Sequence, residues 1–313
     1  MKFEFRPYRR AFRQPLQTSQ GMWAIREGII LRLSNAQGQT SYGEIAPIPW
    51  FGSETLAAAL NFCHQLSGQI NSATIAAIPA NLPACQFGFE SALENLVGPV
   101  SPPPAIAQSL LLPSGNAALD AWKPFWEEGY RTFKWKIGVT ELPRELEICK
   151  ALSLDLPPGA KLRLDANGGL TPQQTIAWLE ACRAFPIEFL EQPLPPTDFA
   201  TMLDLSERYP TPIALDESIA SLEQLRTCYN QGWRSIFVIK PAILGSPGNL
   251  RTFCQTHPID AVFSSALETE IGRQAGLRLA AKLGNPDRAV GYGTSHWFQD
   301  SGVEDFDRLW QSL

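Results

Sequence analysis

The chain has 313 residues, 44% of them hydrophobic, which is enough to bury one large core or a large core plus a smaller domain. Its 26 Lys and Arg against 31 Asp and Glu give a net charge of -5, so it lacks the basic character that nucleic-acid binding requires. The N-terminal MKFEFRPYRR is too charged for a signal peptide, and no stretch is long and apolar enough to span a bilayer. We therefore expect a globular cytoplasmic protein that binds neither nucleic acid nor membranes.

The first hundred residues mix strand-like and helix-like segments. Strands are expected at 1–12, 23–34 and 38–47, and helices at 53–66 and 85–96. The proline-rich GPVSPPPA that follows marks a boundary. We predict an α+β capping domain over residues 1–100, and residues 300–313 could pack back on it.

Residues 101–299 alternate short apolar runs with longer amphipathic ones. The eight expected strands are 105–111, 133–137, 161–165, 187–191, 212–216, 235–240, 261–265 and 289–293. The helices expected between them are 117–129, 141–154, 171–185, 197–209, 221–232, 249–257 and 269–284. Eight strands that alternate with helices favour a (β/α)8-type barrel, a modified TIM barrel, with a doubly wound open sheet as the competing fold.

Charged residues end several of these strands. Lys136, Asp165, Glu191, Asp216 and Lys240 follow apolar runs at intervals of 24 to 29 residues, about one strand-helix unit each. A barrel with this period brings all five to the C-terminal ends of its strands, where barrel active sites form. Each one alone could be an ordinary solvated charge, but five in register indicate a site.

Three converging carboxylates repel one another unless a cation lies between them. An all-oxygen set favours a hard dication, Mg²⁺ above all, with Mn²⁺ as a possible substitute. The three histidines have no ligand spacing, so a histidine metal site is not expected.

Two lysines alternate with apolar residues in FKWKI, so Lys134 and Lys136 point to the same face, roughly 6–7 Å apart. Their mutual repulsion and a nearby cation are expected to lower one ammonium pKa and to make that lysine a base. The alternative, a lysine pair that protects an edge strand from aggregation, suits an open sheet and not a barrel.

These motifs resemble the enolase superfamily, in its muconate-lactonizing-enzyme-like branch. KWK, RLDANGG, FLEQP, ALDES and VIKPAILG occur in the family's order, and GEIAPIPWFGSET is similar to the capping segment that closes over the barrel. A lysine base acting with Mg²⁺ is the known pattern of that superfamily.

Within this branch the chain is most similar to the o-succinylbenzoate synthase family. The short chain, the arginine of RLDAN and a strand-eight segment VGYGTSHWF without an acidic DxD carry this resemblance. It implies a lyase of menaquinone and phylloquinone biosynthesis that dehydrates 2-succinyl-6-hydroxy-2,4-cyclohexadiene-1-carboxylate. N-succinylamino acid racemase and dipeptide epimerase are the alternatives within the superfamily.

The resemblance also implies roles for the residues that match. Asp165, Glu191 and Asp216 would bind Mg²⁺, and Lys136 would remove the α-proton and return it to the departing hydroxide. Lys240 would stabilise the enolate from the opposite side, or act as a second base in a racemase.

Lys134 and Arg163 complete the implied catalytic set. Lys134 would orient the substrate carboxylate, and Arg163 would point towards the lysines, unless it is a barrel-layer residue paired with an acid. Asn167 and Glu217 are candidates to support the metal ligands or to shape their loops.

For substrate binding, the resemblance points to Ser264 and Ser265 at the end of strand seven and to the backbone near Gly291. The segment from Gln17 to Met22, including Gly21, and the turn from Pro49 to Phe51 would form a lid. The aromatic residues of that turn could instead only pack one domain against the other.

Two further readings remain open. A class I aldolase would use Lys240 as a Schiff-base lysine and would need no metal, which leaves the carboxylates unexplained. A non-catalytic binding barrel is the other, although all the site residues are present. The expected partner is a small-molecule carboxylate, and the sequence does not specify the oligomeric state.

Overall fold

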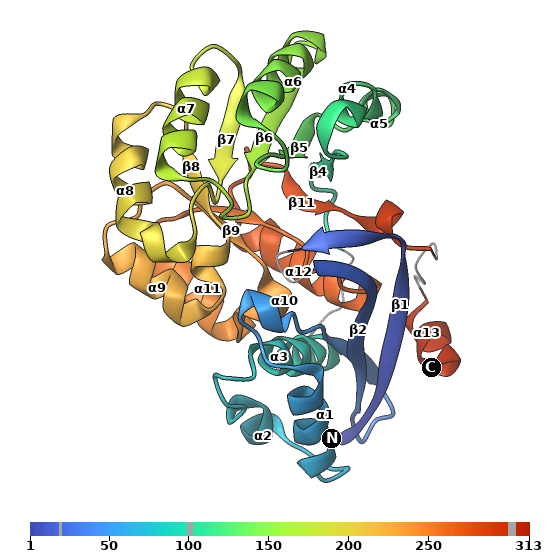
Figure 1. Ribbon diagram of the computed structural model, residues 1–313. Coiled ribbons are helices and arrows are strands. Elements are labelled where there is room, and N and C mark those ends of the chain that lie inside the picture. Colours follow the sequence, from blue (N-terminus) through green and yellow to red (C-terminus); the bar gives the residue numbers. More distant parts are fainter. Residues whose placement is uncertain (19–20, 99–102, 300–304) are drawn as a thin grey trace.

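The computed structural model describes residues 1–18, 21–98, 103–299 and 305–313. It contains a three-stranded antiparallel sheet in the order β1-β2-β3 and an eight-stranded parallel sheet. Figure 1 shows the first sheet and its helices, in blue and cyan, below the strands and helices of the second. No helix in these residues is long and apolar enough to cross a membrane.

The N-terminal sheet consists of a long hairpin and one short strand. Its strands are β1 (Lys2–Thr18), β2 (Gly21–Ser34) and β3 (Thr40–Ile45), and its helices are α1 (Leu56–Gln65), α2 (Ser72–Ala76) and α3 (Pro83–Val97). Helix α3 packs so closely on β3 that only a glycine fits at position 43. A side-chain carbon there would lie 2.1 Å from the Gly88 carbonyl oxygen. The chain end returns to this sheet as α13 (Phe306–Ser312), whose Trp310 ring contacts the guanidinium groups of both Arg6 and Arg32.

The eight parallel strands form the predicted barrel. They are β4 (Gln108–Leu111), β5 (Thr132–Lys136), β6 (Lys161–Asp165), β7 (Ile187–Glu191), β8 (Ile213–Leu215), β9 (Ile236–Ile239), β10 (Asp260–Phe263) and β11 (Val290–Gly293). They pair in sequence order, with β11 beside β4, and a parallel bridge between Ser264 and Gly291 joins the last two strands. The prediction of a barrel is confirmed, and an open doubly wound sheet is not what forms.

Helices cover the outside of the barrel. They are α6 (Leu142–Asp155), α7 (Pro172–Cys182), α8 (Phe199–Arg208), α9 (Leu222–Asn230), α11 (Pro247–Thr256) and α12 (Glu270–Leu283), with the short α10 (Pro241–Leu244) after β9. Hydroxyl side chains cap four of them: Thr171, Ser221, Ser246 and Thr269. The prediction of a single helix over 117–129 was wrong: the segment forms two short helices, α4 (Ala118–Ala121) and α5 (Lys123–Glu127). Pro124, at the start of α5, has no amide hydrogen with which to continue the first helix.

The apolar core inside the barrel is small. The main core lies between strands and helices, whereas the interior cluster contains only Phe189, Ala214, Ile236, Val238 and Val262. The interior is therefore apolar only in its middle layers, and charged side chains fill both ends.

Candidate active site

Three buried carboxylates meet at the C-terminal ends of neighbouring strands. Asp165 ends β6, Glu191 ends β7, and Asp216 follows β8; each is only 2% exposed. Asp165 and Glu191 are partners in the strand register, and Lys136 of β5 is the partner of Asp165 on its other side. The folded chain thus brings together the charged strand ends that the sequence singles out.

Two ammonium groups bind these carboxylates from opposite sides. Lys134 Nζ lies 2.6 Å from Asp165 Oδ2 and 2.7 Å from Glu191 Oε1, and Lys240 Nζ donates to Asp216 Oδ1. The ring centroid of Phe51, from the N-terminal unit, lies 4.1 Å from Lys240 Nζ. Lys134 comes from β5 and Lys240 follows β9, so the lysines flank the carboxylates on both sides of the barrel mouth.

Lys136 differs from these two lysines. In the part of the chain that the structure describes it forms no hydrogen bond or ion pair, although it faces the same side of β5 as Lys134. Of the three lysines at the mouth, Lys136 is therefore the one whose amine is not engaged by a carboxylate.

The protonation equilibria of the carboxylates reflect crowding of negative charge. Burial and repulsion from Asp165 raise the pKa of Glu191 from its ordinary 4.5 to about 7. Burial, opposed by Lys240 and reinforced by Glu217, raises the pKa of Asp216 to about 6. In Asp165 burial has the same tendency, but the positive charges of Lys134 and Lys136 outweigh it and lower the pKa.

Lys134 is strongly stabilised in its charged form. Burial alone would lower the pKa of its ammonium, but Asp165, Glu191 and Asp216 together outweigh that effect and raise the pKa. Without a metal, attraction to three carboxylates exceeds repulsion between the lysines, so Lys134 is a cation that holds its partners and not a base.

The donor chemistry of the site fits a hard dication. The carboxylate oxygens are the ligand type that Mg²⁺ prefers, and Glu217 Oε2, next to Asp216, is buried without a hydrogen-bond partner. Among the residues described, no three acidic, cysteine or histidine side chains are already arranged around a common point. In the metal-free protein Lys134 bridges Asp165 and Glu191, and Lys240 pairs with Asp216, so ammonium groups neutralise the carboxylates.

Asn167 and Glu217 connect the loops that carry two of the carboxylates. The Asn167 backbone amide donates to Asp165 Oδ1 at 3.0 Å, and its side-chain amide donates to Glu217 Oε1 at 3.1 Å. Both residues thus contact the site or its immediate neighbours, as the sequence led us to consider.

Arg163 lies deeper in the barrel than Asp165. It is 1% exposed, and its Nε donates to Glu188 Oε2 at 2.7 Å, while Nη1 is 3.5 Å from Ser109 Oγ. Its Nη2 has no hydrogen-bond partner within the described residues. This geometry matches the alternative of a barrel-layer arginine paired with an acid.

The candidate substrate residues after β10 face different ways. Ser264 continues the inward-facing positions of its strand, and Gly291 lies directly beside it, since a side-chain carbon on Gly291 would lie 2.6 Å from Ser264 Oγ. The Ser265 hydroxyl is engaged, since it donates to Glu268 Oε1 and accepts from the Leu267 amide. Ser264 is therefore the better placed of the two for a ligand.

The two candidate lid segments approach each other. Gly21 and Met22 begin β2, and the Met22 side chain is 63% exposed; residues 19–20 lie outside the described residues. The turn Pro49–Phe51 places Trp50 with its ring centroid 4.9 Å from that of Trp23. Figure 1 shows the far end of the β1–β2 hairpin bending over the barrel near β11.

Sequence reasoning missed the residues that join the N-terminal sheet to the barrel. The buried Glu44 carboxylate accepts from the Thr269 and Gly272 amides at the start of α12, each at 2.9 Å, and from the Tyr8 hydroxyl. Arg26, which lies on the same sheet as Glu44, donates from Nε to the Leu267 carbonyl at 3.2 Å. A glutamate within the apolar strand SYGEI was the only sequence signal of this contact.

Comparison with known proteins places this fold and site in a class. The family model "Enolase C-terminal domain-like" matches residues 117–307, and the model "MenC, N-terminal domain" matches residues 8–96. The capped barrel is therefore that of the enolase superfamily.

Individual relatives narrow the class. The o-succinylbenzoate synthase of Thermosynechococcus vestitus is 43% identical over 100% of this chain and 99% of its own length. That of Aliivibrio salmonicida is 32% identical over 82% of this chain and 79% of its own. The chain belongs to the o-succinylbenzoate synthase family.

Solved structures agree with this assignment. The o-succinylbenzoate synthase crystal structure from Thermosynechococcus elongatus BP-1, with Mg in its active site, superposes with a TM-score of 0.93 at 41% identity, covering 100% of both chains. A dipeptide epimerase from Enterococcus faecalis V583 gives 0.81 at 24% identity over 97% of this chain and 91% of its own, which shows a shared fold alone.

Proposed function

We propose that the chain catalyses the Mg²⁺-dependent syn dehydration of 2-succinyl-6-hydroxy-2,4-cyclohexadiene-1-carboxylate to o-succinylbenzoate, a step of menaquinone and phylloquinone biosynthesis. One observation carries the proposal: three buried carboxylates end neighbouring strands, with an unengaged lysine on one side and a second lysine opposite. Full-length similarity to synthases supports it. Superfamily chemistry that begins with removal of an α-proton needs this arrangement.

Asp165, Glu191 and Asp216 are the proposed Mg²⁺ ligands, and Mn²⁺ is a proposed substitute. The bound ion supplies a positive charge for the substrate carboxylate and for the negative charge that develops as the α-proton leaves. Lys134 remains beside these ligands as a fixed cation that orients the same carboxylate.

Lys136 is the proposed base. Its neutral amine takes the α-proton as the carbon–hydrogen bond breaks, and the electron pair moves into the carboxylate group. The same ammonium then returns the proton to the hydroxyl group that leaves on the same face, so that water departs and the ring becomes aromatic.

Lys240 faces this step from the other side of the mouth. Its positive charge would stabilise the enolate. The Phe51 ring already lies beside this ammonium, and the aromatic ring of the product would make the same kind of cation–π contact. Arg163 would act on the site only through the packing of the barrel layer below Asp165.

Substrate contacts are proposed at the barrel mouth. Ser264, Ser265 and the backbone at Gly291 would bind the succinyl group, and the segment with Gly21 and Met22 would close over it. We also propose a cytoplasmic location and a small-molecule carboxylate substrate.

The test is an ultraviolet assay of the diene substrate with purified protein and Mg²⁺. Wild type and Lys123→Ala, a change in an exposed ion pair, should both consume the diene. Lys136→Ala and EDTA-treated protein should not. If wild type leaves the diene untouched but exchanges the α-proton of N-acylamino acids or dipeptides for deuterium, a racemase or epimerase replaces the synthase.

A further inference from the structure

Gln192, which follows the carboxylate Glu191, has an unusual backbone. Its φ is 36°, in the left-handed region that residues other than glycine rarely adopt, and its side chain is 0% exposed. A buried, strained residue next to a functional group persists only where its surroundings hold it in place.

The Gln192 side chain has a partner for each of its polar atoms. Its Oε1 accepts from the backbone amides of Asp216 at 2.9 Å and Ser218 at 3.1 Å. Its Nε2 donates to the Leu194 carbonyl and to Ser218 Oγ, both at 2.8 Å. The side chain therefore fixes the turn that begins with the carboxylate Asp216.

The Gln192 backbone reaches the two neighbouring loops. Its carbonyl accepts from the Gly168 amide at 2.7 Å, in the loop that follows Asp165, and its own amide donates to the Ala214 carbonyl at 2.8 Å. Gln192 thus contacts the loops after β6 and β8 and itself follows β7. It is bonded to the segments that carry all three carboxylates of the mouth.

We propose that Gln192 is a positioning residue that sets the spacing of Asp165, Glu191 and Asp216 for a divalent cation. It touches neither metal nor substrate; it acts through the backbone of the three ligand-bearing segments. The inference rests on the proposed function, because it takes these carboxylates as the ligands. Outer residues of this kind typically contribute 10- to 100-fold to metal affinity.

A purely structural Gln192 would affect stability but not affinity, so the experiment measures both. Gln192→Met keeps the length of the side chain and loses its hydrogen bonds, whereas Gln192→Gly also relieves the strained φ. Gln174→Met is the control for the same change of side chain, since Gln174 Oε1 accepts a capping hydrogen bond from the Thr171 amide at the exposed start of α7. Mn²⁺ affinity is measured by electron paramagnetic resonance in the absence of substrate. Urea unfolding in EDTA measures the stability of the same variants, and diene turnover is measured as a function of Mg²⁺ concentration.

Both Gln192 variants should bind Mn²⁺ about 10- to 100-fold more weakly than wild type, while the control binds as wild type does. Their turnover should recover towards the wild-type kcat at high Mg²⁺, because the reacting groups are intact. Should either variant fail to fold, Ser218→Ala removes one partner of Gln192 Nε2 and should weaken binding roughly threefold.

Three results overturn the inference in distinguishable ways. Folded variants with wild-type Mn²⁺ affinity show that Gln192 has no positioning role, although the proposed function stands. Weaker binding in Gln174→Met to the same extent shows a general effect of lost stability. If the wild-type protein binds no Mn²⁺, the proposed metal site does not exist, and the proposed function is excluded as well.

Discussion

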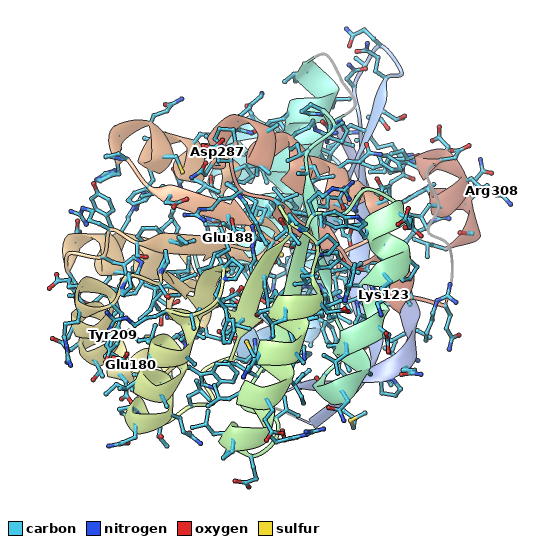
Figure 2. All side chains as sticks on the ribbon, turned by 90° about the horizontal axis from the view of Figure 1, so that it is seen from above. Lys123, Glu180, Glu188, Tyr209, Asp287 and Arg308 are labelled. Atoms are coloured by element: carbon cyan, nitrogen blue, oxygen red, sulfur yellow. The ribbon has the colours of Figure 1, made fainter. Side chains whose placement is uncertain are left out.

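The barrel holds two buried clusters of charge, one at each end, and they are built differently. The mouth cluster, at the C-terminal ends of the strands, consists of Asp165, Glu191, Asp216, Lys134 and Lys240. The base cluster, at the other end, consists of Arg163, Glu188, Asp260, Arg288 and Lys161. In Figure 2, Glu188 of the base cluster lies among the strands, whereas Glu180 lies on an outer helix.

In the base cluster both carboxylates are paired with arginines, and among the described residues the buried Arg163 Nη2 is the one buried side-chain atom of the cluster that has no hydrogen bond. Arg288 donates to both oxygens of Asp260 at 2.6 to 2.9 Å and to Glu188 at 3.2 Å, and Asn285 adds a further hydrogen bond. Burial tends to raise the pKa of Asp260, but these hydrogen bonds outweigh it and the pKa is lowered. The ionised form is the stable one there.

In the mouth cluster the balance is the opposite. Two of its three carboxylates have raised pKa values, and the oxygen Glu217 Oε2 beside them has no hydrogen-bond partner among the described residues. Buried carboxylates whose ionised form is disfavoured are typical of functional sites, whereas carboxylates that arginines keep ionised typically stabilise the fold. The comparison therefore predicts that changes at the mouth affect activity and changes at the base affect stability.

The largest expected effect is on catalysis at the mouth. Lys136→Ala should lower kcat by about 10³-fold or more, since a positioned base contributes roughly 10²- to 10⁴-fold. Its stability should stay close to wild type, because Lys136 forms no ion pair among the described residues. Steady-state turnover of the diene and urea unfolding of the same preparation measure the two quantities.

Lys161→Ala is the matched control, because Lys161 is a half-exposed lysine of the base cluster, on the strand beside that of Lys136. It should keep wild-type turnover. Equal loss of activity in both variants would contradict the division of roles between the two ends of the barrel.

The second prediction concerns stability at the base. Arg288→Ala leaves Asp260 without its main partner and Glu188 with only Arg163 and Lys161, and should lower the free energy of unfolding by about 3 kcal/mol. The folded fraction should retain kcat, since the change lies at the end of the barrel away from the site. Urea unfolding checks the first statement, and turnover normalised to folded protein checks the second.

An exposed arginine serves as the comparison for Arg288. Arg183 pairs with Glu180 on the surface of α7 and its removal should cost no more than about 0.5 kcal/mol. Arg288→Ala with as small a cost as Arg183→Ala would mean that the base cluster contributes little to the fold.

The mouth cluster was accessible from the sequence because local patterns encode it. Its three carboxylates and Lys240 end or follow apolar strands, and the barrel period alone brings strand ends together, so Asp165 and Lys240 could be grouped without coordinates. The eight strands were predictable for the same reason. The break at Pro124 was missed since a helical pattern of apolar residues runs through it.

The base cluster and the positioning residues were not accessible in this way. Arg288 pairs with Glu188 across 100 residues, and Gln192 reaches Asp216 only because its backbone turns into the left-handed region. Neither contact leaves a period or a spacing in the sequence. The direction of the pKa change at Lys134 likewise depends on how many carboxylates surround it, which a motif does not state.

The smallest predicted effect is the pH dependence of stability, which has opposite signs for the carboxylates at the two ends of the barrel. The folded pKa of Glu191 lies above its ordinary value of 4.5, so the folded protein binds more protons than the unfolded chain between pH 4.5 and about 7. Stability of the metal-free protein must therefore fall as pH rises through this window, and Glu191 should contribute on the order of 2–3 kcal/mol. The lowered pKa of Asp260 acts in the opposite sense: its contribution is present above its ordinary pKa of 3.8 and is lost only as pH falls below that value.

Urea unfolding in EDTA at pH 5 and pH 7.5 measures this slope. Asp216 and Glu268 have raised pKa values too and contribute with the same sign, so the share of Glu191 is the difference between wild type and Glu191→Gln. Mg²⁺ should stabilise wild type more at pH 7.5 than at pH 5, because protons and the ion compete for the same carboxylates. Metal-free stability that rises from pH 5 to pH 7.5, with no difference in Glu191→Gln, would show that the mouth cluster is as well satisfied as the base cluster.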